Sequence, residues 1–90
     1  MLVIIKSSPD TPEARQALDL AASMHAEVCL VQNGVGFCLR DRLKGFSGTV
    51  YALGEDMNLR GLEPAGSIRS IDYEQMIDLM TGSDKVVGMF

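Results

Sequence analysis

Cys29 and Cys38 are the two residues of this chain whose side chains could do covalent chemistry, and one ten-residue stretch holds both. A thiolate is a nucleophile, so an accessible cysteine of low pKa can accept a sulfur atom and pass it on. Cys38 is the candidate catalytic residue, because it follows the break at Asn33-Gly34 by about one helical turn and helix N-termini lower a thiol pKa. Packing in the core is the favoured interpretation of Cys38, because it lies about four residues inside the predicted helix, where the dipole effect has faded; Cys29, in an apolar run, is also interpreted as core.

Other residues that could support chemistry form weaker patterns. His25 is the only histidine, and one histidine without partner ligands cannot build a zinc site of three or four ligands, so no metal site is expected. Gly34-Val-Gly36 lacks the third glycine of a dinucleotide fingerprint, so no cofactor is expected. Glu55-Asp56 could be a general acid and base, but two acids at a helix start are more often stabilised by the helix dipole.

Composition limits the class of protein. Ninety residues predict a single domain over 1–90, with 47% hydrophobic and 22% charged residues. The net charge of −4 and the scattered basic residues argue against direct nucleic-acid binding. No run approaches the roughly 18–20 apolar residues of a membrane span. Two cysteines without a CxxC motif or a signal-peptide pattern indicate a reducing, cytoplasmic location.

Apolar runs and helical patterns alternate along the chain, which predicts an α/β fold. Strands are expected at residues 2–6, 26–32, 49–53 and 67–71, and helices at about 12–24, 34–43, 55–59 and 73–81. Asp10 with Glu13, and Asp72 with Gln75, are the predicted capping pairs. Met76, Ile77, Leu79 and Met80 are expected to face inward from the last helix. Residues 86–90 are either a fifth, edge strand or an apolar tail that docks on a partner.

Four motifs succeed one another in this framework, and together they are more specific than any one of them. They are Lys6-Ser-Ser-Pro9, Leu30-Val-Gln-Asn-Gly-Val35, Val50-Tyr-Ala-Leu-Gly-Glu-Asp56 with Arg60-Gly-Leu62, and Ile71-Asp-Tyr73 before a helix containing Leu79. In this order and at these spacings they resemble the TusB/DsrH family of the DsrE/DsrF/DsrH superfamily, over essentially the whole chain. The turn Gln32-Asn33-Gly34 carries much of the resemblance and is the expected binding or family-motif turn.

The resemblance implies a three-layer α/β/α sandwich with a mostly parallel sheet of four to five strands. It also implies a cytoplasmic sulfur-relay complex with DsrE/TusD-like and DsrF/TusC-like subunits, as a homo- or hetero-oligomer. Such relays pass persulfide sulfur toward 2-thiouridine at the tRNA wobble position or serve dissimilatory sulfur oxidation. The catalytic paralogues carry their cysteine at the end of the third strand, where this chain has Leu53-Gly54. DsrH-type chains carry one in the first helix, where this chain has Ala17.

Because neither cysteine falls on a family position, we expect an architectural subunit and not a catalytic one. Two alternatives remain open from the sequence. In one, the protein is itself a sulfurtransferase that carries persulfide on Cys38. In the other, it is a small regulatory module that binds an anion or another small ligand in the turn Asn33–Gly36.

Overall fold

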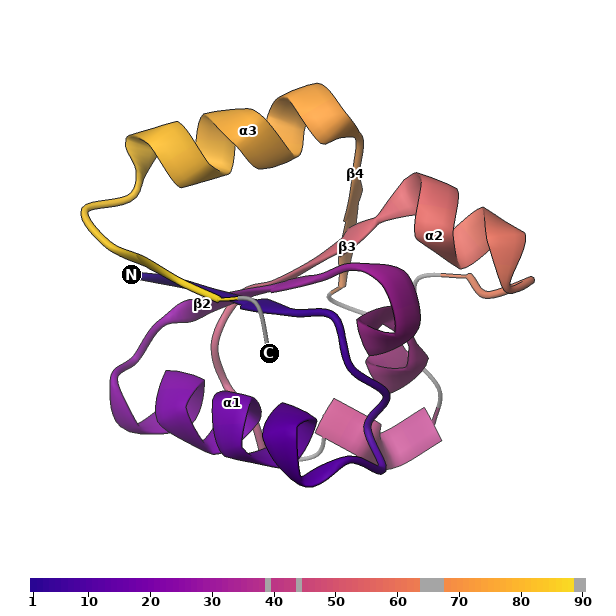
Figure 1. Ribbon diagram of the computed structural model, residues 1–90, viewed down its shortest axis with the longest axis horizontal. Coiled ribbons are helices and arrows are strands. Elements are labelled where there is room, and N and C mark those ends of the chain that lie inside the picture. Colours follow the sequence, from indigo (N-terminus) through magenta and orange to yellow (C-terminus); the bar gives the residue numbers. More distant parts are fainter. Residues whose placement is uncertain (39, 44, 64–67, 89–90) are drawn as a thin grey trace.

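A computed structural model describes residues 1–38, 40–43, 45–63 and 68–88, which form a parallel sheet with helices on both faces (Figure 1). In chain order, the elements are β1 (Leu2–Ile5), α1 (Pro12–Ser23), β2 (Glu27–Leu30), the 3₁₀ helices η1 (Gln32–Cys38) and η2 (Arg40–Leu43), β3 (Val50–Leu53), α2 (Gly54–Leu59), β4 (Arg69–Ile71), α3 (Tyr73–Gly82) and β5 (Val86–Val87). The predicted α/β fold is confirmed, and all five strands are parallel.

The strand order β4-β3-β2-β1-β5 explains how the layers arise. From β1 to β4 each new strand is added on the same side of the last, whereas β5 returns across the sheet to pair with β1. Crossovers between parallel strands are right-handed. A connection that runs in the opposite direction along the sheet therefore places its helix on the opposite face. Figure 1 shows the result: α1 and the two 3₁₀ helices lie on one face and α3 lies on the other.

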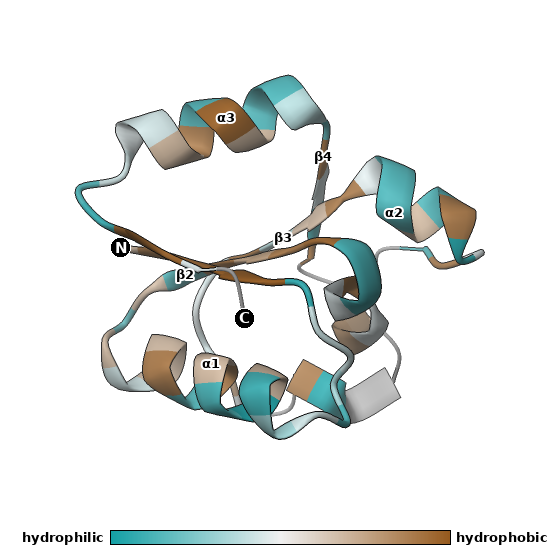
Figure 2. Cartoon of the chain, in the orientation of Figure 1, coloured by the Kyte–Doolittle hydropathy of each residue, from teal (hydrophilic) through white to brown (hydrophobic). Residues whose placement is uncertain are grey.

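The strands are largely hydrophobic (Figure 2), and alternate strand residues contribute to an apolar core on each face of the sheet. Val3 and Ile5 belong to the cluster that includes the α1 alanines, whereas Leu2 and Ile4 belong to the cluster beneath α3. Strands that are apolar on both faces are typical of parallel sheets covered on both sides. Ala14, Ala17 and Ala21 are fully buried in α1, which lets that helix lie close to the sheet.

The helix ends follow local capping rules with one correction. Thr11, and not Asp10, caps α1, since its hydroxyl oxygen accepts from the Ala14 backbone N–H. Pro12, the first residue of α1, suits the start of a helix because it needs no N–H partner there. The predicted capping box of Asp72 and Gln75 is confirmed at the start of α3.

The segment after β2 is not the α-helix predicted over 34–43. It forms η1 and η2, two 3₁₀ helices, with residue 39 outside the described part of the chain. Two glycines among the seven residues of η1 weaken α-helix propensity, and short 3₁₀ pieces tolerate such sequences. Cys38 therefore stands at the end of η1 and has no α-helical N-terminus behind it.

Helix α3 is packed differently from its prediction. Met76 and Leu79 pack against the sheet, but Ile77 and Met80 are 56% and 37% exposed. Of the tail, Val86 and Val87 form an edge strand, and residues 89–90 lie outside the described part. The predicted strand at 67–71 is observed as Arg69–Ile71, with residue 67 also outside.

Candidate functional site

The turn after β2 is held against the end of β1 by Gly34. A Cβ atom at this position would lie 2.1 Å from the carbonyl oxygen of Ile5, which no side chain can tolerate. The Gly34 N–H donates to the carbonyl oxygens of Lys6 and Val31 at 3.0 and 2.9 Å. Gln32, two residues earlier, adopts a positive φ of 50°, a conformation uncommon outside glycine. Close packing and this backbone conformation fix where the motif Gln32-Asn33-Gly34 presents its polar groups.

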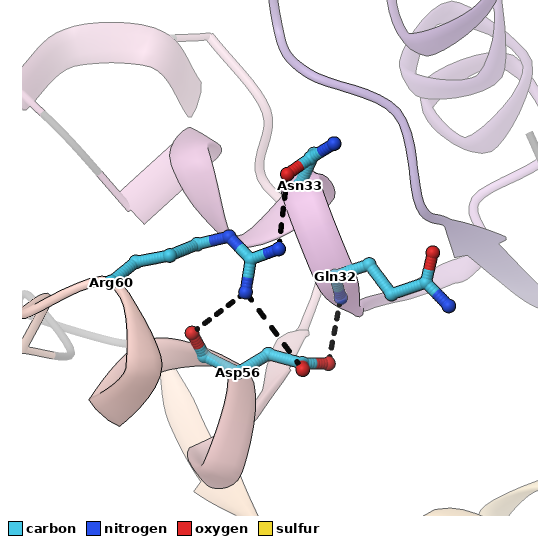
Figure 3. A network of polar contacts seen from close by, with 4 residues as sticks. All are labelled: Gln32, Asn33, Asp56 and Arg60. Atoms are coloured by element: carbon cyan, nitrogen blue, oxygen red, sulfur yellow. Dashed lines mark hydrogen bonds and ion pairs between the residues drawn. The ribbon is translucent and has the colours of Figure 1, made fainter.

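Those polar groups meet residues from α2 in a small network (Figure 3). The Gln32 backbone N–H donates to Asp56 Oδ2 at 2.7 Å, and Arg60 Nη2 donates to Asn33 Oδ1 at 3.0 Å. Arg60 Nη1 donates to the Asp56 carbonyl oxygen at 3.2 Å and lies 3.9 Å from Asp56 Oδ1. The network joins the carboxyl ends of β2 and β3, where ligands bind in open α/β sheets.

The sequence predicts Gln32, Asn33 and Gly34 as one turn but does not connect them with Asp56 or Arg60. Arg60 also contacts the carbonyl end of α2 through its bond to the Asp56 carbonyl oxygen. Gly61, with φ of 65°, follows the end of this helix in a conformation that favours glycine. The turn meets Asp56 and Arg60 because β2 and β3 are neighbours in a parallel sheet, and residues just after neighbouring parallel strands meet at one edge.

A cavity of about 150 Å³ adjoins the network between α3 and the ends of β1 and β2. Its lining is mainly apolar, with the two polar residues at one side: Ile4, Val31, Tyr73, Met76 and Met80, together with Gln32 and Asp56. Apolar walls with a few placed polar groups are the usual composition of a binding pocket. We call this cavity the Asp56 groove.

The two thiols lie away from this site and on opposite faces of the sheet. Cys29 packs in the cluster under α3, whereas Cys38 packs with the cluster on the α1 face. Both are free and buried, and burial raises the pKa of Cys29 to about 11 and raises the pKa of Cys38 as well. A raised pKa keeps the thiol protonated at neutral pH, which is the reverse of what a sulfur-carrying nucleophile needs.

The remaining candidates stay apart from the network. His25 is exposed and lines a separate hollow of about 300 Å³ with Phe46, at the turn between α1 and β2. No group of three or more potential metal ligands occurs among the described residues. Within the same residues, no helix has both the length and the apolar character to cross a membrane.

The chain resembles a known protein family and a solved structure. The model of a family described as DsrH-like protein matches residues 6–86. The solution NMR structure of protein Tm0979 from Thermotoga maritima is 29% identical, with a TM-score of 0.62, and the alignment covers 98% of this chain and 100% of that one. A search of curated proteins finds no match.

Proposed function

This chain belongs to the DsrH-like family, and from that premise we propose that it is an architectural subunit of a cytoplasmic sulfur-relay complex. The family consists of sulfur-relay subunits, which work in complexes with DsrE- and DsrF-like proteins. We propose DsrE/TusD-like and DsrF/TusC-like chains as the partners here. The sulfur would pass either to tRNA wobble uridine or along a dissimilatory oxidation pathway.

The observation that carries the architectural role is the burial of both thiols. Cys29 is fully buried and Cys38 is 5% exposed, so neither can reach a donor persulfide without opening the core. The end of β3, where the resemblance places the paralogues' cysteine, is occupied by Leu53, whose side chain is buried beneath α3. A relay through this protein alone would need a thiol that the fold keeps covered.

The test uses the chain co-expressed with the DsrE- and DsrF-like chains of its own genome. After incubation with a cysteine desulfurase and cysteine, intact-mass spectrometry should find the added sulfur, about 32 Da, on a partner and not on this chain. The matched control is a thiol-free variant, Cys29→Val with Cys38→Val, which should assemble and support transfer as the wild type does. Loss of transfer from an assembled thiol-free complex would contradict the proposal.

The two alternatives predict different outcomes, one in the same experiment and one in a separate ligand-binding measurement. An adduct on Cys38 that disappears in Cys38→Val would make this chain a sulfur carrier. An anion cradle at Asn33–Gly36 would appear as a melting shift with sulfate or phosphate, because binding to the folded state stabilises it. The carboxylate of Asp56, bonded to the Gln32 N–H at the same turn, disfavours an anion there.

A further inference from the structure

We infer that the Asp56 groove receives one long basic side chain, of lysine or arginine type, from a partner subunit. The identity of that partner rests on the proposed function, whereas the chemistry of the groove does not. The groove combines mainly apolar lining residues from α3 and the ends of β1 and β2 with the acidic residue Asp56. A lysine or arginine side chain has the matching division into an apolar stem and a charged head.

The carboxylate of Asp56 has bonding capacity left for such a cation. Its side chain is 14% exposed, and its Oδ2 already accepts from the Gln32 backbone N–H. Among the described residues no hydrogen bond reaches Oδ1, since Arg60 Nη1 at 3.9 Å is too distant to donate. A carboxylate accepts several hydrogen bonds when ionised, so an ammonium or guanidinium group can bind here beside the existing contacts.

The walls suit the stem of the same side chain. Met76 and Met80 are unbranched and adapt to an inserted chain, and the Tyr73 ring can contact a cation through its face. The volume of about 150 Å³ equals that of about five water molecules, which is close to the five heavy atoms of a lysine side chain. Size and polarity therefore favour an elongated cation over an anionic group.

The surroundings carry charge of the complementary sign. Asp72 and Glu74, the sequence neighbours of the groove residue Tyr73, are exposed acids. Arg60 is the one basic residue in the network, and it is engaged with Asn33 and Asp56. The excess of acids favours a basic partner surface, and a buried charge pair also selects against wrong partners.

The first test measures the groove without any partner. We would titrate the ¹⁵N- and methyl-labelled protein with n-butylammonium and with n-butanol, following the Gln32 amide and the Ile4, Val31, Met76 and Met80 methyl groups. We expect n-butylammonium to bind at least about ten-fold more tightly than n-butanol, because only the cation pairs with Asp56. Equal binding of the two probes, or shifts confined to other surfaces, would overturn the inference.

Two variants make this test specific. Asp56→Asn keeps an oxygen for the Gln32 N–H but removes the charge, so the preference for the cation should vanish. Glu55→Gln removes the same charge from the adjacent residue and should leave the preference unchanged. If Asp56→Asn does not fold, Met80→Trp fills the groove from an exposed position and should abolish binding of both probes. Retained cation binding in Met80→Trp would contradict the inference.

The second test uses the complex with the DsrE- and DsrF-like chains. We expect Asp56→Asn to weaken assembly at least about ten-fold and Glu55→Gln less than about two-fold. A complex that forms equally well with Asp56→Asn overturns the inference and leaves the proposed function intact. Failure of both paralogues to bind the wild type contradicts the proposed function, whatever the butylammonium result. Asp56-dependent self-association would instead make a second copy the occupant and overturn the partner assignment.

Discussion

Gly34 is the residue on which the geometry of the candidate site most directly depends. Gly34→Ala would drive a methyl group to 2.1 Å from the Ile5 carbonyl oxygen, so β1 and the turn must separate. We expect a loss of at least about 2 kcal/mol in the free energy of unfolding, measured by urea denaturation. Gly82→Ala is the matched control, because nothing lies within 4 Å of its added methyl group. Similar losses in both variants would refute the packing argument.

Cys29 gives a prediction about pH. Its pKa rises from 9.0 to about 11 through burial, so the folded protein holds this proton over a range in which the unfolded chain releases it. The stabilisation is complete below pH 9 and is lost as the pH rises toward about 11.

The wild type should therefore lose about 2 kcal/mol relative to Cys29→Val between those pH values. Urea denaturation of both proteins across that range measures the difference. Cys29→Val is the control, because both proteins share the other groups that titrate there. Parallel pH profiles for the two proteins would show that Cys29 is not responsible.

At the scale of elements, α3 depends on its N-terminal cap more than α1 does. It spans ten residues and has no fully buried side chain, whereas α1 buries three alanines. Asp72→Ala removes the bond from the Gln75 N–H to the Asp72 carboxylate, measured at 2.8 Å. We expect a loss of about 1 kcal/mol by urea denaturation. Asp78→Ala, an exposed acid in the same helix, should cost less than half as much, and a reversed order would contradict the cap's role.

The types of most helices and strands were predictable from the sequence because local residue patterns indicate them. The strands show as short apolar runs, and the capping box of Asp72 and Gln75 is a local signal. The 3₁₀ character of η1 differs from the predicted α-helix, although the two glycines of η1 are a local signal against an α-helix. The exposure of Ile77 was not predictable, because helical periodicity gives an apolar arc but not how much of it the sheet covers.

Only part of the candidate site was predictable, because some of its residues meet through contacts between distant segments of the chain. Gln32, Asn33 and Gly34 are adjacent in sequence, and a turn motif identifies them. Asp56 and Arg60 join them across 24 and 27 residues, through the pairing of β2 with β3. Strand order is set by the whole sheet, and one sequence alone does not determine it.

At the scale of the whole molecule, the two faces of the sheet are covered unequally. Among the residues that the structure describes, fourteen buried residues belong to the cluster on the α1 face and six to the cluster on the α3 face. Segments with little buried apolar area open at a lower free-energy cost than the rest of the core. We therefore expect amide hydrogen exchange of α3 to proceed through local opening, at least about ten-fold faster than that of β2 and β3.

Native-state exchange measured at increasing urea tests this expectation. The α3 amides should show weak urea dependence at low urea, while those of β2 report global unfolding. The amides of α1, a helix of similar length on the better covered face, are the internal control. Equal protection of α1 and α3 would show that the unequal cores do not translate into unequal stability.

The return of the chain across the sheet also orders the events of folding. Strands β1 to β4 are added one beside the next, so each pairing closes a loop of moderate length. β5 must instead cross from one edge to the other before Val86 and Val87 can align with Leu2 and Val3, which are separated from them by most of the sequence. Contacts between residues so far apart in the sequence form late, because closing the long loop costs entropy before the contacts between its ends stabilise the structure. Refolding should therefore build the four-strand sheet first and seat α3 and β5 last, so a nascent chain would expose the α3 face of its sheet until α3 and β5 have been synthesised.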